Sequence, residues 1–292
     1  MEFIYIYLAA LASSMAVGRI TKIRWAGRML PFVTGALIFL MGMWAGNEIR
    51  SLPAIGSLFV SSAEILIPSV AIGYALAYAF RDDEGKRRSK QAQRGKLPYV
   101  FIACAATGWA LGSLVILPSA SLDITILLIV LVIVIGIDMG PSITFGSFKR
   151  DLKHSWIPFS ALAGALIGGV LSSLVFGLNV KFAIAASVGL GWYSLDGPLI
   201  SSYFGPTFGM VGFMVNFLRE QLTFFVVPAL RNQKPGALLT IGGSTTMDDT
   251  LSLYATSLGD DYKEIALFNG LVLSIILPFL LPAVLSARGA HR

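Results

Sequence analysis

The sequence predicts an all-α polytopic membrane protein, on the strength of its composition, its hydropathy and the placement of its charges. Of 292 residues, 55% are hydrophobic and only 13% are charged, whereas soluble domains carry about 25% charged residues. The mean hydropathy is +0.76, and apolar runs extend over the whole chain. Runs of about 20 apolar residues favour helices over the alternating strands of a barrel. We therefore expect a single transmembrane domain over residues 1–292, which excludes a soluble enzyme with one anchor and a disordered chain.

Six apolar runs in the first 176 residues are expected to span the membrane. They cover residues 2–17, 29–46, 58–80, 98–117, 122–136 and 157–176. The first run is expected to be a retained span, because its positive charges begin at Arg19 and follow the apolar core, whereas those of a signal peptide precede it.

The loops between these runs carry very different numbers of Lys and Arg residues. The first, third and fifth loops hold four, seven and three, while the second and fourth hold one and none. Because short cytoplasmic loops hold the excess positive charge, this ratio of 14 to 1 places the third loop, residues 81–96, inside the cell. It favours a plasma-membrane protein with its N-terminus outside. The basic third loop is then expected to contact anionic lipid headgroups rather than nucleic acid.

The C-terminal third contains four apolar stretches, of which two are interrupted. The stretches cover residues 180–203, 207–230, 237–257 and 263–285. The first and third contain Gly, Pro, hydroxyl and acidic residues at 189–198 and 242–249. Irregular backbone at membrane depth requires satisfaction by protein or by a watery cavity. We expect about eight transmembrane helices plus two re-entrant or broken segments, with ten full spans as the alternative; both place the C-terminus outside.

A faint internal repeat relates residues 37–46 to residues 130–140. The charge distribution orients these two runs in opposite directions, as in the inverted repeats of transporters. Inverted repeats of about 1–120 and 121–292 are therefore one interpretation. Chance similarity between two glycine-containing apolar runs is the other.

Acidic residues inside apolar stretches are the strongest functional signal, because each costs about 2.5–3.5 kcal/mol to insert into a membrane. Glu220 lies in the middle of the 207–230 stretch, with Asn216 on the same helical face. Arg219 points about 100° away from Glu220 around the helix axis. We therefore expect it to be a structural counter-charge to an acid elsewhere, such as Asp248 or Asp249. The alternative for Glu220 and Arg219 is a polar network that holds helices together.

The two interrupted segments supply further polar groups that suit a small polar substrate or an ion. Trp192 and Tyr193 offer aromatic faces that can hold a cation, or they anchor the chain at the membrane interface. A single cysteine, Cys104, and two histidines in a loop and a tail argue against a metal site or another cofactor. The expected substrate or proton-binding residues are Glu220, Asp248, Asn216, Asp249, Asp196, Ser244, Thr245, Thr246, Trp192, Tyr193 and Ser194.

Five ordered motifs between residues 189 and 251 resemble the LysO lysine exporter family of bacteria and archaea. They are Gly191-Trp-Tyr-Ser194, Phe204-Gly-Pro206, Asn216-x-x-Arg-Glu220, Pro228-x-Leu-Arg231 and Gly243-x-Thr-x-Met-Asp248. The resemblance implies export of L-lysine and of its analogue thialysine, with both termini outside and with essential acids at Glu220 and Asp248. At Asp249 the family carries an apolar or aromatic residue, and at Asp196 a small or polar one, so both acids are departures.

The charge of such a substrate implies a coupling ion. Moving one positive charge outward costs about 2.3 kcal/mol per 100 mV of inside-negative potential, and exchange for one proton cancels that cost. Protons are therefore the expected coupling ion. The alternative is a sodium-coupled importer of a small polar or cationic solute, because hydroxyls and unwound carbonyls also suit Na⁺. An intramembrane aspartyl protease is disfavoured, because Ser257-Leu-Gly-Asp260 lacks the first glycine of the Gly-x-Gly-Asp pattern, so no enzyme activity is expected. The sequence defines no oligomeric state.

Overall fold

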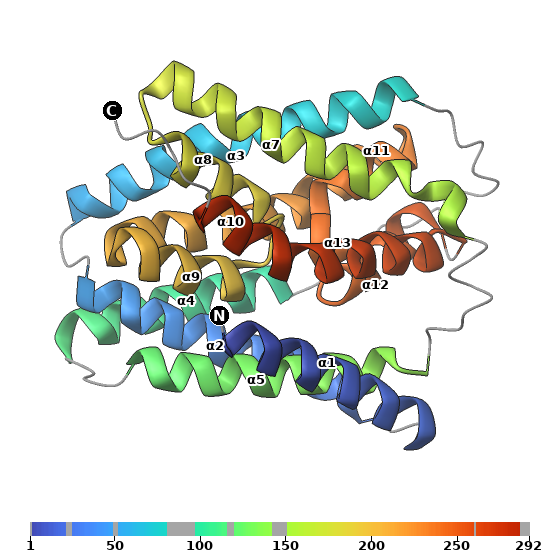
Figure 1. Ribbon diagram of the computed structural model, residues 1–292, viewed down its shortest axis with the longest axis horizontal. Helices are drawn as coiled ribbons and strands as arrows, with labels where there is room; N and C mark the ends of the chain where they lie inside the picture. Colours follow the sequence, from blue (N-terminus) through green and yellow to red (C-terminus); the bar gives the residue numbers. More distant parts are fainter. Residues whose placement is uncertain are drawn as a thin grey trace. The chain divides into compact units, whose positions relative to one another are not determined.

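The computed structural model describes residues 2–21, 25–48, 52–80, 97–115, 120–141, 151–259 and 261–286. Within these ranges every regular element is a helix and none is a strand (Figure 1). The predicted 81–96 loop, Asp260 and His291 lie outside the described residues. The all-helical class is confirmed.

Among the described residues, five helices are long and apolar enough to cross a membrane. They cover Ala26–Asn47, Ile55–Phe80, Leu152–Phe176, Pro206–Ala229 and Asp261–Ser286. The chain is thus a multi-pass membrane protein by the length and composition of its helices. The number of eight transmembrane helices and the inverted repeat stay predictions.

The chain divides into two compact units, and the first is built from Met1–Ser51 and Lys96–Arg150. Its helices are α1 (Glu2–Thr21), α2 (Ala26–Glu48), α4 (Leu97–Leu114) and α5 (Ala120–Met139).

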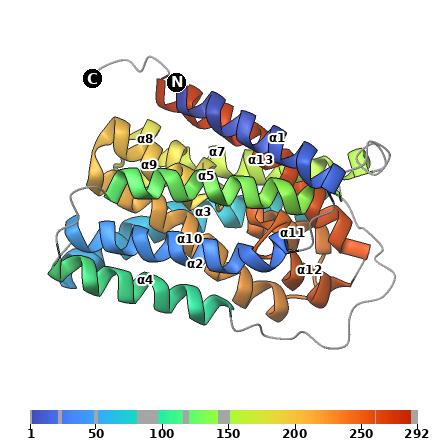
Figure 2. The ribbon, with the colours of Figure 1, turned by 90° about the horizontal axis from the view of Figure 1, so that it is seen from below.

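Glycines allow α2 and α4 of the first unit to pack side by side (Figure 2). A Cβ atom on Gly42 of α2 would lie 2.5 Å from the carbonyl oxygen of Ala105, and one on Gly112 of α4 would lie 2.0 Å from that of Met43. Small residues at such crossings let two membrane helices approach closely, which is a main source of association where lipid replaces water.

The second unit comprises Leu52–Gly95 and Asp151–Arg292. Its elements are α3 (Leu52–Phe80), η1 (Leu152–His154), α7 (Trp156–Phe176), α8 (Val180–Val188), α9 (Tyr193–Phe204), α10 (Pro206–Ala229), α11 (Pro235–Gly242), η2 (Gly243–Met247), α12 (Leu251–Leu258) and α13 (Asp261–Ser286).

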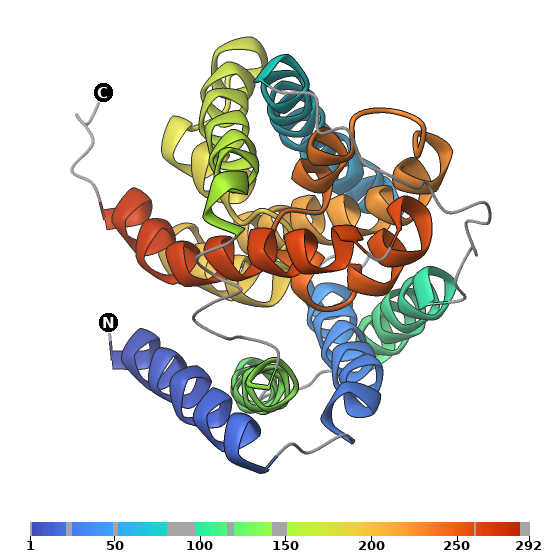
Figure 3. The same ribbon diagram turned by 90° about the vertical axis from the view of Figure 1, so that its right-hand side faces the viewer.

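In the second unit α3 and α7 run beside each other, as Figures 1 and 3 both show. A Cβ atom on Gly164 of α7 would lie 2.3 Å from the Cα atom of Gly73, so these two helices are also in close backbone contact. The Ser172 hydroxyl donates to the Glu64 carbonyl oxygen over 2.7 Å and joins them further.

Both segments that the sequence predicts to be broken are interrupted helices. The first consists of α8 and α9, separated by residues 189–192, and the second of α11, η2 and α12. The interruptions lie at positive φ angles: 48° at Leu190, 97° at Gly191 and 62° at Gly243. Such angles end a right-handed helix and favour glycine. The interruption of both segments is therefore confirmed, and it is located at these three residues.

Candidate functional site

The two interrupted helices meet at their breaks. The backbone N–H of Ser244 donates to the carbonyl oxygen of Leu190 over 2.8 Å, and the Ser244 hydroxyl donates to the same oxygen over 3.1 Å. A Cβ atom on Gly243 would lie only 2.2 Å from that oxygen. The contact therefore depends on glycine in the second segment and on an unwound carbonyl in the first.

Helix breaks leave backbone groups without intrahelical partners, and two side chains of α10 satisfy several of them. Asn216 Oδ1 accepts from the Gly191 N–H over 2.8 Å. Arg219 Nε donates to the carbonyl oxygen of Ile241 and Nη2 to that of Thr240, each over 2.9 Å. Helix α10 thereby holds the breaks of both segments.

The arginine contacts correct the expectation that Arg219 balances Asp248 or Asp249. Its hydrogen bonds go instead to the last turn of α11, where unpaired carbonyls carry partial negative charge and attract a cation. The sequence signal for this role is absent, because nothing in residues 235–242 marks them as an acceptor for a guanidinium group.

Two further residues stabilise the second break and were not identified from the sequence. The Tyr254 hydroxyl donates to the Leu238 carbonyl oxygen over 3.0 Å and accepts from the Gly242 N–H over 3.1 Å. Asn269 Nδ2 lies 3.0 Å from both the Gly243 carbonyl oxygen and Thr246 Oγ1. Asn269 could have been found as an amide inside the apolar 263–285 stretch, whereas Tyr254 carries no such mark.

Three carboxyl groups and a phenol converge next to this crossing. Glu220 of α10 is fully buried, and no donor among the described residues is positioned to form a hydrogen bond of normal length and angle with either of its carboxyl oxygens. Its carboxyl group interacts with the Tyr193 hydroxyl and, electrostatically, with Asp248 and Asp249. Asp248 and Asp249 follow η2 and are partly exposed, so one side of the cluster is accessible. In the described part of the chain these acids form no group that could hold a metal ion.

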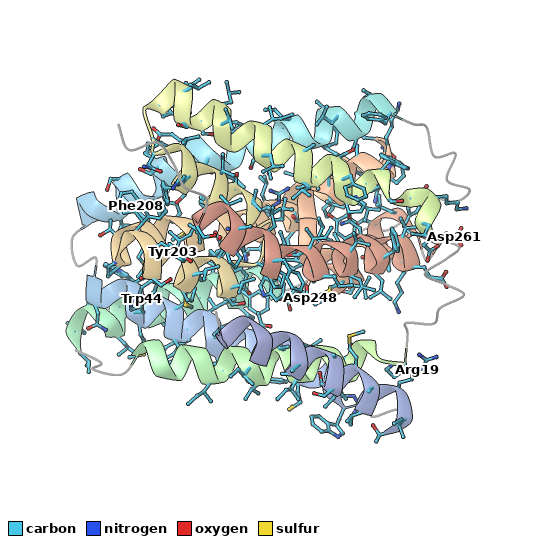
Figure 4. The ribbon with its side chains drawn as sticks, in the orientation of Figure 1. Arg19, Trp44, Tyr203, Phe208, Asp248 and Asp261 are labelled. Carbon is cyan, nitrogen blue, oxygen red and sulfur yellow. The ribbon has the colours of Figure 1, made fainter. Side chains whose placement is uncertain are left out.

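The acid cluster lies away from the ends of the helices. In Figure 4, Asp248 lies between Phe208 and Asp261 along the length of the helices. Glu220 is 14 residues from Pro206 and 9 from Ala229 in α10, or about 21 Å and 13 Å at 1.5 Å per residue. Glu220 therefore lies mid-helix in an apolar segment, as the sequence predicted.

An aromatic group of α9 and α10 forms a wall beside Glu220. Tyr193 packs edge-on against Phe213 and Phe217, with ring centroids 5.6 Å and 5.9 Å away. Tyr193 is buried, whereas Trp192 is partly exposed. Tyr193 thus lies inside the protein and contributes its hydroxyl to the acid cluster, which is a different position from that of an interface anchor.

The other hydroxyl-bearing residues of the predicted site lie either at the crossing or in α9. The hydroxyls of Ser244, Thr245 and Thr246 donate to the carbonyl oxygens of Leu190, Gly242 and Gly243 and so stabilise the crossing. Ser194 is buried in the first turn of α9.

Asp196, by contrast, accepts a hydrogen bond of 2.7 Å from Asn216 Nδ2. The structure therefore pairs Asp196 with Asn216, one helical turn before Glu220 on α10.

Comparisons with known proteins relate this chain to lysine exporters. The family model described as lysine exporter LysO matches residues 102–285. The lysine exporter LysO of Escherichia coli (strain K12) is 29% identical over 155 residues, which cover 53% of this chain and 52% of that protein. The "Putative lysine exporter" of Haemophilus influenzae is 32% identical over 117 residues, covering 40% of this chain and 60% of that protein.

The chain spans little more than half the length of the curated relatives it matches. No solved structure matches it. The family model, however, covers more than half of the chain and contains the crossing, the acid cluster and both α10 side chains that hold the breaks. This chain therefore belongs to the lysine exporter LysO family.

Proposed function

We propose that this protein exports L-lysine and its analogue thialysine across the cell membrane in exchange for protons. The observation that carries the proposal is the convergence of Glu220, Asp248 and Asp249 beside the crossing of two interrupted helices. Discontinuous helices that meet at membrane depth form the substrate sites of several transporter folds. Two relatives of this chain are named as lysine exporters.

The chemistry of the cluster suits a diamine with one carboxylate. An ammonium group makes strong charge-assisted hydrogen bonds to carboxylates, and the Glu220 oxygens have none of ordinary geometry within the protein. Two of the Arg219 donors, Nε and Nη2, bind α11 rather than the cluster. The N-terminus of α9, which begins at Tyr193 beside Glu220, carries the partial positive charge that suits the carboxylate of the substrate.

A carboxylate that binds either an ammonium group or a proton provides the exchange. Lysine carries a net charge of +1, so outward movement alone works against the membrane potential at about 2.3 kcal/mol per 100 mV. Inward movement of one proton per lysine cancels this term. Because the deprotonated acid is the form that binds a cation, the affinity for lysine should weaken as the pH falls.

The proposed arrangement in the membrane follows the charge distribution of the loops. Eight transmembrane helices and two re-entrant or broken segments place both termini outside the cell. The interrupted segments then enter from opposite sides or cross fully, and in both arrangements their breaks supply the irregular backbone that lines the site.

The test uses purified protein in liposomes that contain a lysine gradient. Glu220→Gln and Asp248→Asn should each reduce lysine flux more than tenfold while the protein remains folded in the membrane. Asp261→Asn, at an exposed acid in the first turn of α13, is the matched control and should retain flux. Near wild-type flux in either cluster variant would show that the residue is structural.

The coupling ion is tested by the proton release that accompanies binding. Calorimetry of lysine binding in buffers of different ionisation enthalpy should show net proton release, and liposome flux should not require Na⁺. Binding without buffer dependence, together with flux that requires Na⁺, would refute proton exchange.

A further inference from the structure

Asp196 is a buried acid that the three-acid cluster leaves out. It is fully buried in the first turn of α9, and its Oδ2 atom accepts one hydrogen bond, from Asn216. Its Oδ1 atom is buried and has no hydrogen-bond partner. An amide is a neutral donor, so it compensates a carboxylate charge only in part.

The elements that pack against α9 place no cation on Asp196. The main neighbours of α9 are α8, α10 and α13. Their charged residues within the described ranges are Lys181, Arg219, Glu220, Asp261, Lys263 and Glu264. Lys181 lies at the start of α8, the residues of α13 lie in its first turn, Arg219 binds α11, and Glu220 belongs to the cluster. A buried carboxyl group without a cation is the setting in which an acid takes up a proton.

Asn216 connects Asp196 to the crossing of the interrupted helices. Its Nδ2 atom carries two protons but lies within hydrogen-bond distance of three acceptors: Asp196 Oδ2 at 2.7 Å, and the carbonyl oxygens of Ala186 and Gly212 at 3.0 Å. Its Oδ1 atom holds the Gly191 N–H, next to the Leu190 carbonyl that accepts from Ser244. The amide is therefore shared between Asp196 and the break.

We propose that Asp196 is a second proton-binding site, in addition to the carboxylates that bind the amine or a proton. A carboxylate attracts the Asn216 amide more strongly than the neutral acid does. Proton uptake at Asp196 therefore lets the amide shift towards the Ala186 carbonyl at the end of α8. The position of the break, and with it the segment from Ser244 to Asp248, then depends on whether Asp196 holds a proton. This inference deepens the proposed lysine–proton exchange and rests on it for the identity of the substrate.

The first test needs no substrate. Infrared difference spectra of the full protein in lipid, recorded from acid to neutral pH, should contain a carboxylic-acid carbonyl band that changes with pH. The band should be lost in Asp196→Asn, shifted in Asp196→Glu, and retained in Glu220→Gln and in the surface control Asp261→Asn. If Asp196→Asn does not fold, the shift in Asp196→Glu decides. A spectrum unchanged by both Asp196 substitutions would overturn the proposal.

The second test measures the protons released for each lysine bound. Asp196→Asn should lower this number relative to the wild type, whereas Asp261→Asn should not. Wild-type proton release that Asp196→Asn leaves unchanged would overturn the role of Asp196 in coupling and leave the proposed exchange intact. Wild-type protein that binds no lysine would refute the proposed function instead, and the infrared experiment would still decide whether Asp196 binds a proton.

Discussion

The crossing of the interrupted helices predicts a large effect of the substitution Gly243→Ala. The backbone angles of Gly243, φ 62° and ψ −126°, lie where residues with a Cβ atom are rarely found, at a cost of about 1–3 kcal/mol. The added Cβ atom would also lie 2.2 Å from the Leu190 carbonyl oxygen. That oxygen must then move away from the Ser244 N–H and hydroxyl, which contribute about 0.5–1.5 kcal/mol each. We expect a total destabilisation of about 2–6 kcal/mol.

Gly205 provides a matched control for this substitution. Its angles, φ 92° and ψ 169°, are also unfavourable for other residues, but a Cβ atom there would meet nothing within 4 Å. Gly205→Ala should therefore cost only the backbone strain of about 1–3 kcal/mol. The assay is unfolding by SDS in mixed micelles, combined with lysine flux in liposomes. Equal unfolding free energies and equal flux for the two variants would refute the contact between the breaks.

Three further predictions concern the cation at α11, the amide on α13 and the orientation in the membrane. Arg219→Leu leaves two buried carbonyls without a charged donor, so we expect the unfolding free energy to fall by about 2–4 kcal/mol in the same assay. Arg219→Lys should lie between Leu and the wild type, because an ammonium group cannot reproduce the two-pronged contact of the guanidinium group. An unchanged unfolding midpoint would contradict this prediction. Asn269→Leu should lower the unfolding free energy by about 1–3 kcal/mol and slow lysine flux. Stability and flux at wild-type levels would show that the amide does not hold η2. Cysteines introduced into residues 81–96 of a Cys104→Ala protein should resist an impermeant thiol reagent in intact cells, and rapid labelling would reverse the predicted orientation.

Much of the helical architecture follows from local properties of the chain. The run predicted at 157–176 corresponds to α7, Trp156–Phe176, and the run predicted at 58–80 lies within α3, Leu52–Phe80. The agreement has a simple reason, because the length of an apolar run and the charges that flank it determine where a membrane helix forms. Glycine, proline and acids in 189–198 and 242–249 likewise indicated the two breaks.

The identity of helix neighbours was not predictable in the same way. Gly42 and Gly46 of α2, and Gly108 and Gly112 of α4, are each spaced four residues apart and mark surfaces for close packing. A glycine pair indicates that a helix has such a surface without indicating its partner. The pairing of α2 with α4, and of α3 with α7, depends on contacts between segments distant in the sequence.

The sequence by itself determined that this protein is helical, that it belongs in a membrane, and that Glu220 lies at depth inside a helix. These properties depend on residues close together in the chain, so periodicity and composition express them. Only the tertiary structure decided the partners of the polar side chains. It directed Arg219 to the carbonyls of α11 and paired Asp196 with Asn216. Most buried polar groups pair with a donor or acceptor that is close in space. The crossing of two interrupted helices creates such donors and acceptors, and no local pattern of residues indicates them.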